Sequence, residues 1–185
     1  AAALLAGAWV IVRRLPAPPP PAPRVAGTTA RVSAPLKRLI TAYGLFGFGY
    51  VVTATFIVAI VRRLEHAAVF EPLTWIVVGL LAAPSIFAWQ RVAQRFGIDA
   101  TLRLAYALEA AGVLLAGFGA GPVAIVLGGA LLGGTFVGIT ALGLIAARQH
   151  AVAHQDRVIG WMTASFGLGQ LLGPAVAGRL AETTN

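Results

Sequence analysis

The sequence predicts an all-α, polytopic bundle of transmembrane helices, and two observations support this fold class. First, hydrophobic residues make up 58% of the 185 residues and charged residues only 11%, with a mean hydropathy of +0.84, whereas about a quarter of the residues of a soluble domain are charged. Second, the apolar residues form uncharged runs of 19 to 38 residues, and a helix of about 20 residues crosses the hydrocarbon core of a bilayer. The lipid bilayer is therefore the first predicted partner.

The first element is Ala1–Val12, a run of 12 uncharged residues. Such a helix spans only ~18 Å of a ~30 Å core, and Arg13 and Arg14 follow the run, whereas a signal peptide carries its positive charges before it. We therefore expect the end of a transmembrane helix, cut by the boundary of a fragment. Residues 13–38 are expected to be a linker, because Leu15–Pro35 holds 7 of the 11 prolines and proline-rich segments are extended and solvated.

Five full spans are expected to follow, at about residues 39–61, 72–90, 102–119, 122–147 and 158–178, with residues 182–185 as an external tail. The uncharged stretch Ala110–Ala147 has 38 residues, and a helix of ~57 Å is too long to be one span. The break is predicted at Gly117–Pro122, because its glycines favour a turn and its proline suits the start of a helix.

The distribution of basic residues predicts the orientation. Of the 14 lysines and arginines, 11 fall on one side of the predicted spans and 3 on the other. Basic loops stay in the cytoplasm, so the linker and the loops Arg91–Arg103 and Arg148–Arg157 are predicted to be cytoplasmic and the loop Arg62–Glu71 external. The expected location is the inner or plasma membrane. The net charge of +8 is explained in this way, and no nucleic-acid partner is expected.

Two of these cytoplasmic regions carry motifs. A short basic loop with an Arg-x-Gly ending joins the second and third full spans, at Arg91, Arg95 and Gly97. A second motif begins at Asp156, Arg157 and Gly160 and continues into a helix with Gly169, Gly173, Pro174 and Gly178. Glycines four residues apart let a neighbouring backbone approach closely, and a proline bends the helix. Generic helix dimerisation would use the same glycine spacing.

In this order, the features resemble the C-terminal half of a major facilitator superfamily (MFS) transporter, although Gln94 stands where that family has an acidic residue. The first full span, Tyr43–Phe56, resembles the YbfB/YjiJ-type branch. The resemblance covers essentially the whole chain. It implies a partial six-helix half, made of a stub and five full spans, that pairs with the N-terminal six-helix half and the last helix of the same polypeptide. It also implies a small-molecule substrate, whose identity the sequence does not give.

Polar residues inside spans are candidates for the substrate cavity, because a polar group in a bilayer needs a partner or water. The resemblance implies that the first and fourth full spans line the transport cavity, and their candidates are Tyr43, Tyr50, Thr53, Thr135 and Thr140. The alternative for each threonine is that it satisfies a backbone carbonyl. The alternative for each tyrosine is that it packs between helices.

Glu109 is the acidic residue inside a predicted span. It lies ~9 Å from Arg103 along a helix, and an ionised carboxylate at that depth is costly. We therefore expect Glu109 to be protonated, paired or beside water. Two roles stay open, namely proton coupling and a structural hydrogen bond to an adjoining helix.

No catalytic group of residues is visible, so the protein is not expected to be an enzyme. The sequence has no cysteine, and His150 and His154 lack a third ligand, so neither a metal nor a cofactor is expected. The function predicted first is secondary active transport of small solutes by alternating access. The alternatives are a structural or assembly membrane protein, and a membrane-embedded enzyme, which would need clustered histidine, aspartate or cysteine.

Overall fold

The computed structural model describes residues 33–62, 67–119, 121–151 and 155–184. The predicted stub, most of the linker and His154 lie outside these residues. The described residues contain no strand and form five helices: α2 (Ala34–Val61), α3 (Ala67–Phe96), α4 (Ile98–Phe118), α5 (Gly121–His150) and α6 (Gln155–Thr184). The predicted all-α fold is confirmed.

The helices extend beyond the apolar runs that predict them. α2 begins at Ala34 instead of residue 39, and Ser33 caps it, because the Ser33 hydroxyl accepts the Leu36 N–H at 3.4 Å and the Ser33 carbonyl accepts the Lys37 N–H at 3.0 Å. The predicted linker therefore ends before the basic pair Lys37 and Arg38. A charged residue marks where an apolar run stops, and it does not by itself stop a helix.

Two glycines with positive φ lie on either side of α4. Gly97 has φ 83° and is the single residue between α3 and α4, and Gly121 has φ 79° where α5 begins. Residues with a side chain rarely adopt such angles. The Gly97 carbonyl also accepts the Thr101 hydroxyl at 2.7 Å, which ties the first turn of α4 to the connection. The break predicted at residues 117–122 therefore lies between α4 and α5.

Four of the five helices are long and apolar enough to cross a membrane. These segments are Ala34–Ala59, Val69–Phe96, Ile98–Phe118 and Gly121–His150. α6 has the length but is not among them, because glycines and polar residues such as Gln170 dilute its apolar content. The span predicted at residues 158–178 is thus a helix whose crossing of the membrane stays a prediction.

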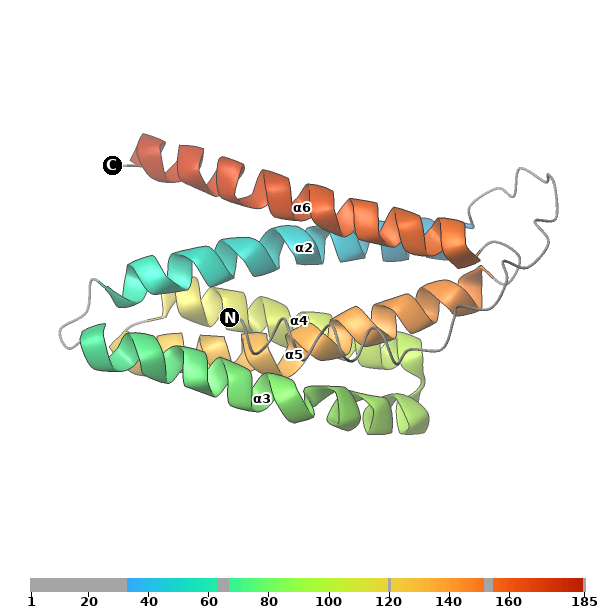
Figure 1. Cartoon of the computed structure of the whole chain (residues 1–185), viewed down its shortest axis with the longest axis horizontal. Coiled ribbons are helices and arrows are strands. Elements are labelled where there is room, and N and C mark those ends of the chain that lie inside the picture. The colour runs from blue at the N-terminus through green and yellow to red at the C-terminus, as the bar shows by residue number, and fades with distance from the viewer. Residues whose placement is uncertain (1–32, 63–66, 120, 152–154, 185) are drawn as a thin grey trace, which may run out of the picture. The chain divides into compact units, whose positions relative to one another are not determined.

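The helices pack as a pair and a group of three. α2 lies along α6, while α5 lies along both α3 and α4 (Figure 1). The larger buried core lies toward the helix ends that carry most basic residues and includes Trp89, Ile139 and Met162. A smaller one lies toward the opposite ends, around Ile57 and Ile125. Large apolar side chains also cover the outside, as in a protein that lipid surrounds; examples are Leu80, Phe87, Phe118 and Leu171.

Candidate functional site

An aromatic cluster joins four helices within the larger core. Its members come from α2, α4, α5 and α6 and are Tyr43, Phe46, Tyr50, Tyr106, Phe136 and Phe166. Phe46 is at the centre, because its ring centroid lies 5.6 to 6.3 Å from the ring centroids of the other five. Aromatic pairs at such distances stabilise each other beyond the effect of area burial. The cluster therefore links the α2–α6 pair to α4 and α5.

The two tyrosines predicted to line a cavity are both in this cluster. Tyr43 is only 4% exposed, and its ring lies over Gly143, where an added Cβ would be 3.0 Å from Tyr43 Cε2. Tyr50 is half-buried and stacks on Phe136, with ring centroids 4.2 Å apart and the rings 21° from parallel. Both tyrosines pack between helices in this structure.

The three candidate threonines contact backbone carbonyl oxygens of their own helices. The hydroxyl groups of Thr53 and Thr140 donate to the carbonyl oxygens four residues earlier, each at 2.9 Å, and the Thr135 hydroxyl lies 2.7 Å from the Leu131 carbonyl oxygen. Such a bond satisfies a hydroxyl group in an apolar surrounding without any other helix. Thr53 and Thr135 are buried and Thr140 is partly buried. The backbone bonding that the sequence leaves open as an alternative is present at Thr53 and Thr140, and at Thr135 a backbone carbonyl oxygen is within hydrogen-bond distance.

Thr135 makes a second contact, with Glu109 of α4. Its hydroxyl group donates to Glu109 Oε2, and the Glu109 side chain is buried, with 7% of its surface exposed. Glu109 Oε1 has no hydrogen-bond partner among the described residues. Arg103 is exposed and makes no ion pair with Glu109. The carboxyl group therefore faces α5 and has one side-chain partner there.

Close contact between α4 and α5 brings these two residues together. A Cβ added at Gly128 would lie 2.8 Å from the Gly112 carbonyl oxygen, and one at Gly112 would lie 2.8 Å from Leu131 Cβ. Glu109 is one turn from Gly112, and Thr135 is two turns from Gly128, so both lie along this line of contact. The glycines that let the backbones touch thus place the carboxyl group against the threonine.

Tyr106 was not among the predicted site residues. It is one turn before Glu109 on α4, and its hydroxyl group is buried without a hydrogen-bond partner among the described residues. Its ring packs edge-on against Phe46, with centroids 6.2 Å apart. The Tyr106 hydroxyl and Glu109 Oε1 are therefore two unsatisfied polar atoms on one helix, and a water molecule or a polar solute can satisfy such atoms. In the sequence, the signal that could have marked Tyr106 is its position three residues before Glu109, which puts both residues on one face of a helix.

Trp89 is a second residue that the sequence did not mark. Its indole N–H donates to the Gly134 carbonyl oxygen at 2.6 Å, and its ring occupies the place where Gly138 would carry a side chain. A buried tryptophan usually finds a partner for its N–H. Trp89 therefore contributes to the packing of α3 on α5, near the helix ends that carry most of the basic residues.

The predicted packing glycines of α6 lie against α2. A Cβ added at Gly169 would overlap the Gly44 carbonyl oxygen, and one at Gly173 would lie 2.8 Å from the Phe48 carbonyl oxygen. Pro174 is inside α6. Gly178 differs, because a Cβ there would meet nothing within 4 Å. Two of the three glycines thus permit close helix contact, and Gly178 permits none among the described residues.

The residues of the two predicted loop motifs lie mostly in helices. Arg91 and Arg95 belong to the last turns of α3, and only Gly97 lies between helices. The expected loop is therefore a single residue. The members of the second motif, Asp156, Arg157 and Gly160, are exposed residues at the start of α6. The structure does not bring these two motifs together with Glu109 or with the aromatic cluster.

Metal ligands do not gather in the part of the chain that the structure describes. No three histidine, aspartate or glutamate residues there are close enough to hold an ion. His150 is exposed at the end of α5.

Comparison with known proteins identifies the family. No curated protein and no solved structure matches the chain. A family model described as "Uncharacterised MFS-type transporter YbfB" matches residues 1–185, which is the branch that the first full span resembles. Together with four helices that are able to cross a membrane, this match shows an integral membrane protein with a role in transport. The chain belongs to the YbfB family of MFS-type transporters.

Proposed function

We propose that the protein is a secondary transporter that moves small solutes by alternating access. The observation that carries the proposal is the match of an MFS-type transporter model to the whole chain. Alternating access needs two bundles that move against each other around a fixed site. The proposal therefore includes a second six-helix half that pairs with this one. It also includes that the protein moves its solute without catalysing a chemical reaction.

The aromatic cluster is the proposed cavity wall. It combines apolar rings with hydroxyl groups, and two of its members, Tyr43 and Tyr50, are residues for which the family resemblance implies a place beside the solute. Tyr50 is the first candidate contact, because it is partly exposed and stacks on Phe136 with centroids 4.2 Å apart. Such a wall suits an apolar or amphipathic solute better than a multiply charged one, because it offers no counter-charge of its own.

Glu109 gives the proposal two versions. In the first, the carboxyl group takes up and releases a proton during the cycle. In the second, it only bonds α4 to α5. The contact with Thr135 supports the second version, while the unsatisfied Oε1 and Tyr106 hydroxyl support the first, since they leave room in the hydrogen-bonding pattern for a proton or a water molecule.

The orientation follows from the charges. Exposed basic residues lie at the ends of α2, α3 and α6 that lie together (Figure 1), namely Lys37, Arg91, Arg95 and Arg157. These ends are proposed to lie on the cytoplasmic side of an inner or plasma membrane. A structural or assembly protein without transport is the second candidate, because the glycine contacts of α2, α5 and α6 would serve packing equally well.

Solute flux separates these candidates. The protein would be reconstituted into proteoliposomes and tested against a panel of apolar, amphipathic and charged small solutes. Saturable uptake that Tyr50→Ala weakens, and that the matched change Phe87→Ala on the exposed side of α3 (Phe87 is 62% exposed) leaves unchanged, would support the proposal. Saturable uptake of no solute by a correctly folded protein would favour the structural role.

A further inference from the structure

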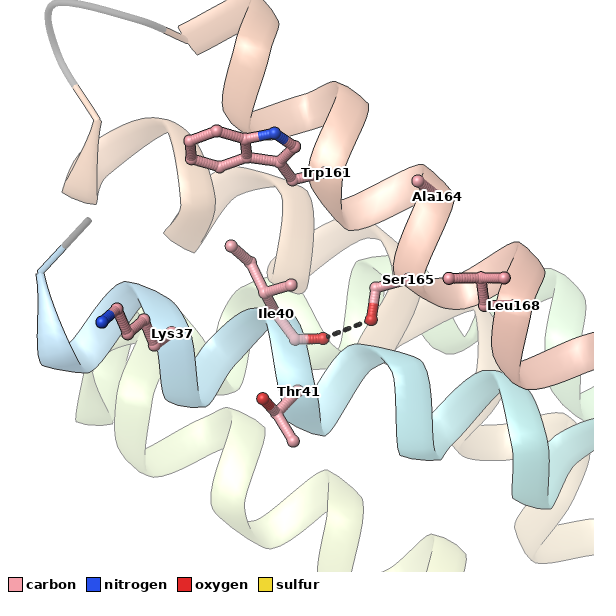
Figure 2. A pocket seen from close by; sticks show the side chains of 7 residues that line it. All are labelled: Lys37, Ile40, Thr41, Trp161, Ala164, Ser165 and Leu168. Carbon is pink, nitrogen blue, oxygen red and sulfur yellow. Dashed lines mark hydrogen bonds between the residues drawn. The ribbon is translucent and has the colours of Figure 1, made fainter. Parts of the chain in front are cut away.

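A groove between α2 and α6 lies outside the aromatic cluster and has no role in the transport proposal. It is an open groove of about 520 Å³, lined by Lys37, Ile40, Thr41, Trp161, Ala164, Ser165 and Leu168 (Figure 2). The lining is mainly apolar, with Lys37 nearest the helix ends and the hydroxyl groups of Thr41 and Ser165 further along the two helices. We propose that this groove binds one anionic phospholipid, with the headgroup at Lys37 and one acyl chain along α2 and α6.

The basic end of the groove supplies the charge complementarity. Lys37 is exposed in the groove wall and has no ion-pair partner among the described residues. The Arg157 guanidinium lies 5.9 Å from the centre of the Trp161 ring, and Arg38 follows Lys37 in the sequence. Asp156 is the acidic residue in the first turns of the two helices that form the groove, and the basic residues Lys37, Arg38 and Arg157 outnumber it there. Basic pockets between transmembrane helices are a known way to hold anionic headgroups.

The hydroxyl groups of the groove leave one donor for the headgroup. The Ser165 hydroxyl donates to the Ile40 carbonyl oxygen at 2.9 Å (Figure 2), so it holds the two helices together and is already used. The Thr41 side chain is exposed, and its hydroxyl group makes no hydrogen bond within the described chain. A phosphate or glycerol oxygen of the lipid can therefore accept hydrogen bonds from both the Thr41 hydroxyl and the Lys37 ammonium group.

An apolar track continues from the groove toward the middle of the membrane. On α2, Leu45 lies one turn beyond Thr41 and is 66% exposed. On α6, Leu168 and Leu172 follow Trp161 on the same face and are 59% and 57% exposed. The distance from Trp161 to Leu172 is ~16 Å along the helix, which matches half of a ~30 Å hydrocarbon core. Trp161 lies within two turns of the start of α6, so the proposal places it at the headgroup level, which tryptophan prefers.

The experiment is native mass spectrometry of the full chain, purified in detergent and incubated with phosphatidylglycerol or phosphatidylcholine. The wild type is expected to retain one phosphatidylglycerol in preference to phosphatidylcholine. Lys37→Gln should weaken retention about fivefold, the change that corresponds to about 1 kcal/mol for one basic residue near a lipid headgroup. Arg148→Gln is the matched control, since Arg148 is also exposed at a helix end but does not line the groove, and it should leave retention unchanged.

A second pair of variants tests the groove itself without altering charge. Ala164→Leu fills the groove and should displace the lipid, whereas Ala175→Leu adds the same bulk on the exposed part of α6 outside the groove and should not. Equal weakening by Lys37→Gln and Arg148→Gln, equal retention of both phospholipids, or unchanged retention by Ala164→Leu would each overturn the proposal. An experimental structure with another part of the polypeptide in the groove would overturn it as well.

Discussion

The Thr135 hydroxyl of α5 donates to the Glu109 carboxyl group of α4, within one turn of Gly112 and two turns of Gly128, where the two backbones touch. Both side chains are buried, at 2% and 7% exposure. The same hydroxyl group lies 2.7 Å from the Leu131 carbonyl oxygen, which the helix backbone can satisfy without it. The Thr135 hydroxyl can therefore donate its hydrogen bond to Glu109, and this hydrogen bond joins two helices that are already in contact through their glycines.

Removal of this hydroxyl group should destabilise the bundle. Thr135→Val keeps the shape of the side chain but leaves Glu109 without its side-chain donor, and an unsatisfied buried polar group costs about 1–3 kcal/mol. We expect a lower unfolding midpoint in detergent titrations. Thr135→Ser keeps the hydroxyl group and should stay within about 1 kcal/mol of the wild type. Equal stability of the valine and serine variants would contradict the role of the bond.

The contact between α2 and α6 should be sensitive to bulk at Gly173. A Cβ there would lie 2.8 Å from the Phe48 carbonyl oxygen, so Gly173→Leu must push the helices apart, at a cost of about 1–3 kcal/mol or more. Gly178→Leu is the control, because a Cβ at Gly178 meets nothing within 4 Å. Thermal unfolding of both variants in detergent would compare them. A Gly173 variant as stable as the Gly178 variant would show that the close contact is dispensable.

The sequence predicts the helices well because their signal is local. Long uncharged runs and the glycines before Pro122 are properties of neighbouring residues, and they indicate each of the five helices in the part of the chain that the structure describes. The ends are harder to predict, since Arg91 and Arg95 mark where the apolar run stops, while the helix continues to Phe96. Charged side chains at the membrane edge are solvated there and do not disturb a helix.

The candidate site is less predictable because it depends on how the helices fit together. Glu109 and Thr135 are 26 residues apart, and the register between them depends on how α4 packs on α5, including the contact of Gly112 with Gly128. Tyr106 could have been noticed from its place one turn before Glu109, but an aromatic residue in a span equally well faces lipid. Thr53 and Thr140 bond to their own backbones, which the residue type alone does not distinguish from lining a cavity.

The orientation can be tested directly because the chain has no cysteine. Single cysteines would be placed at Gln94, which is exposed near the end of α3, and at Phe118, which is 86% exposed at the end of α4. A membrane-impermeant maleimide added to intact cells should label the cysteine at position 118, and the one at position 94 only after permeabilisation. Labelling of both from the same side would contradict the predicted topology.

The hydrogen bond from Trp89 should contribute to the packing of α3 on α5. Trp89→Phe keeps an aromatic ring but loses the N–H that bonds the Gly134 carbonyl oxygen at 2.6 Å. The loss should cost about 0.5–1.5 kcal/mol, measured as a shift of the unfolding midpoint in detergent. Trp75→Phe is the control, because Trp75 is 41% exposed on the same helix. Equal shifts would assign the effect to the aromatic area and not to the bond.

The role of Glu109 in transport can be separated from its role in packing by Glu109→Gln. Glutamine keeps the length of the side chain and an oxygen that accepts the Thr135 hydroxyl, so the contact between α4 and α5 should survive and the unfolding midpoint should change little. It cannot release a proton. If Glu109 couples transport to protons, this variant should lose accumulation driven by a pH gradient while it still exchanges solute across the membrane at near wild-type rates, because exchange needs no net proton movement. Accumulation equal to that of the wild type would leave Glu109 with only its structural bond to α5, and Thr135→Val would then reduce transport only as far as it lowers the amount of folded protein.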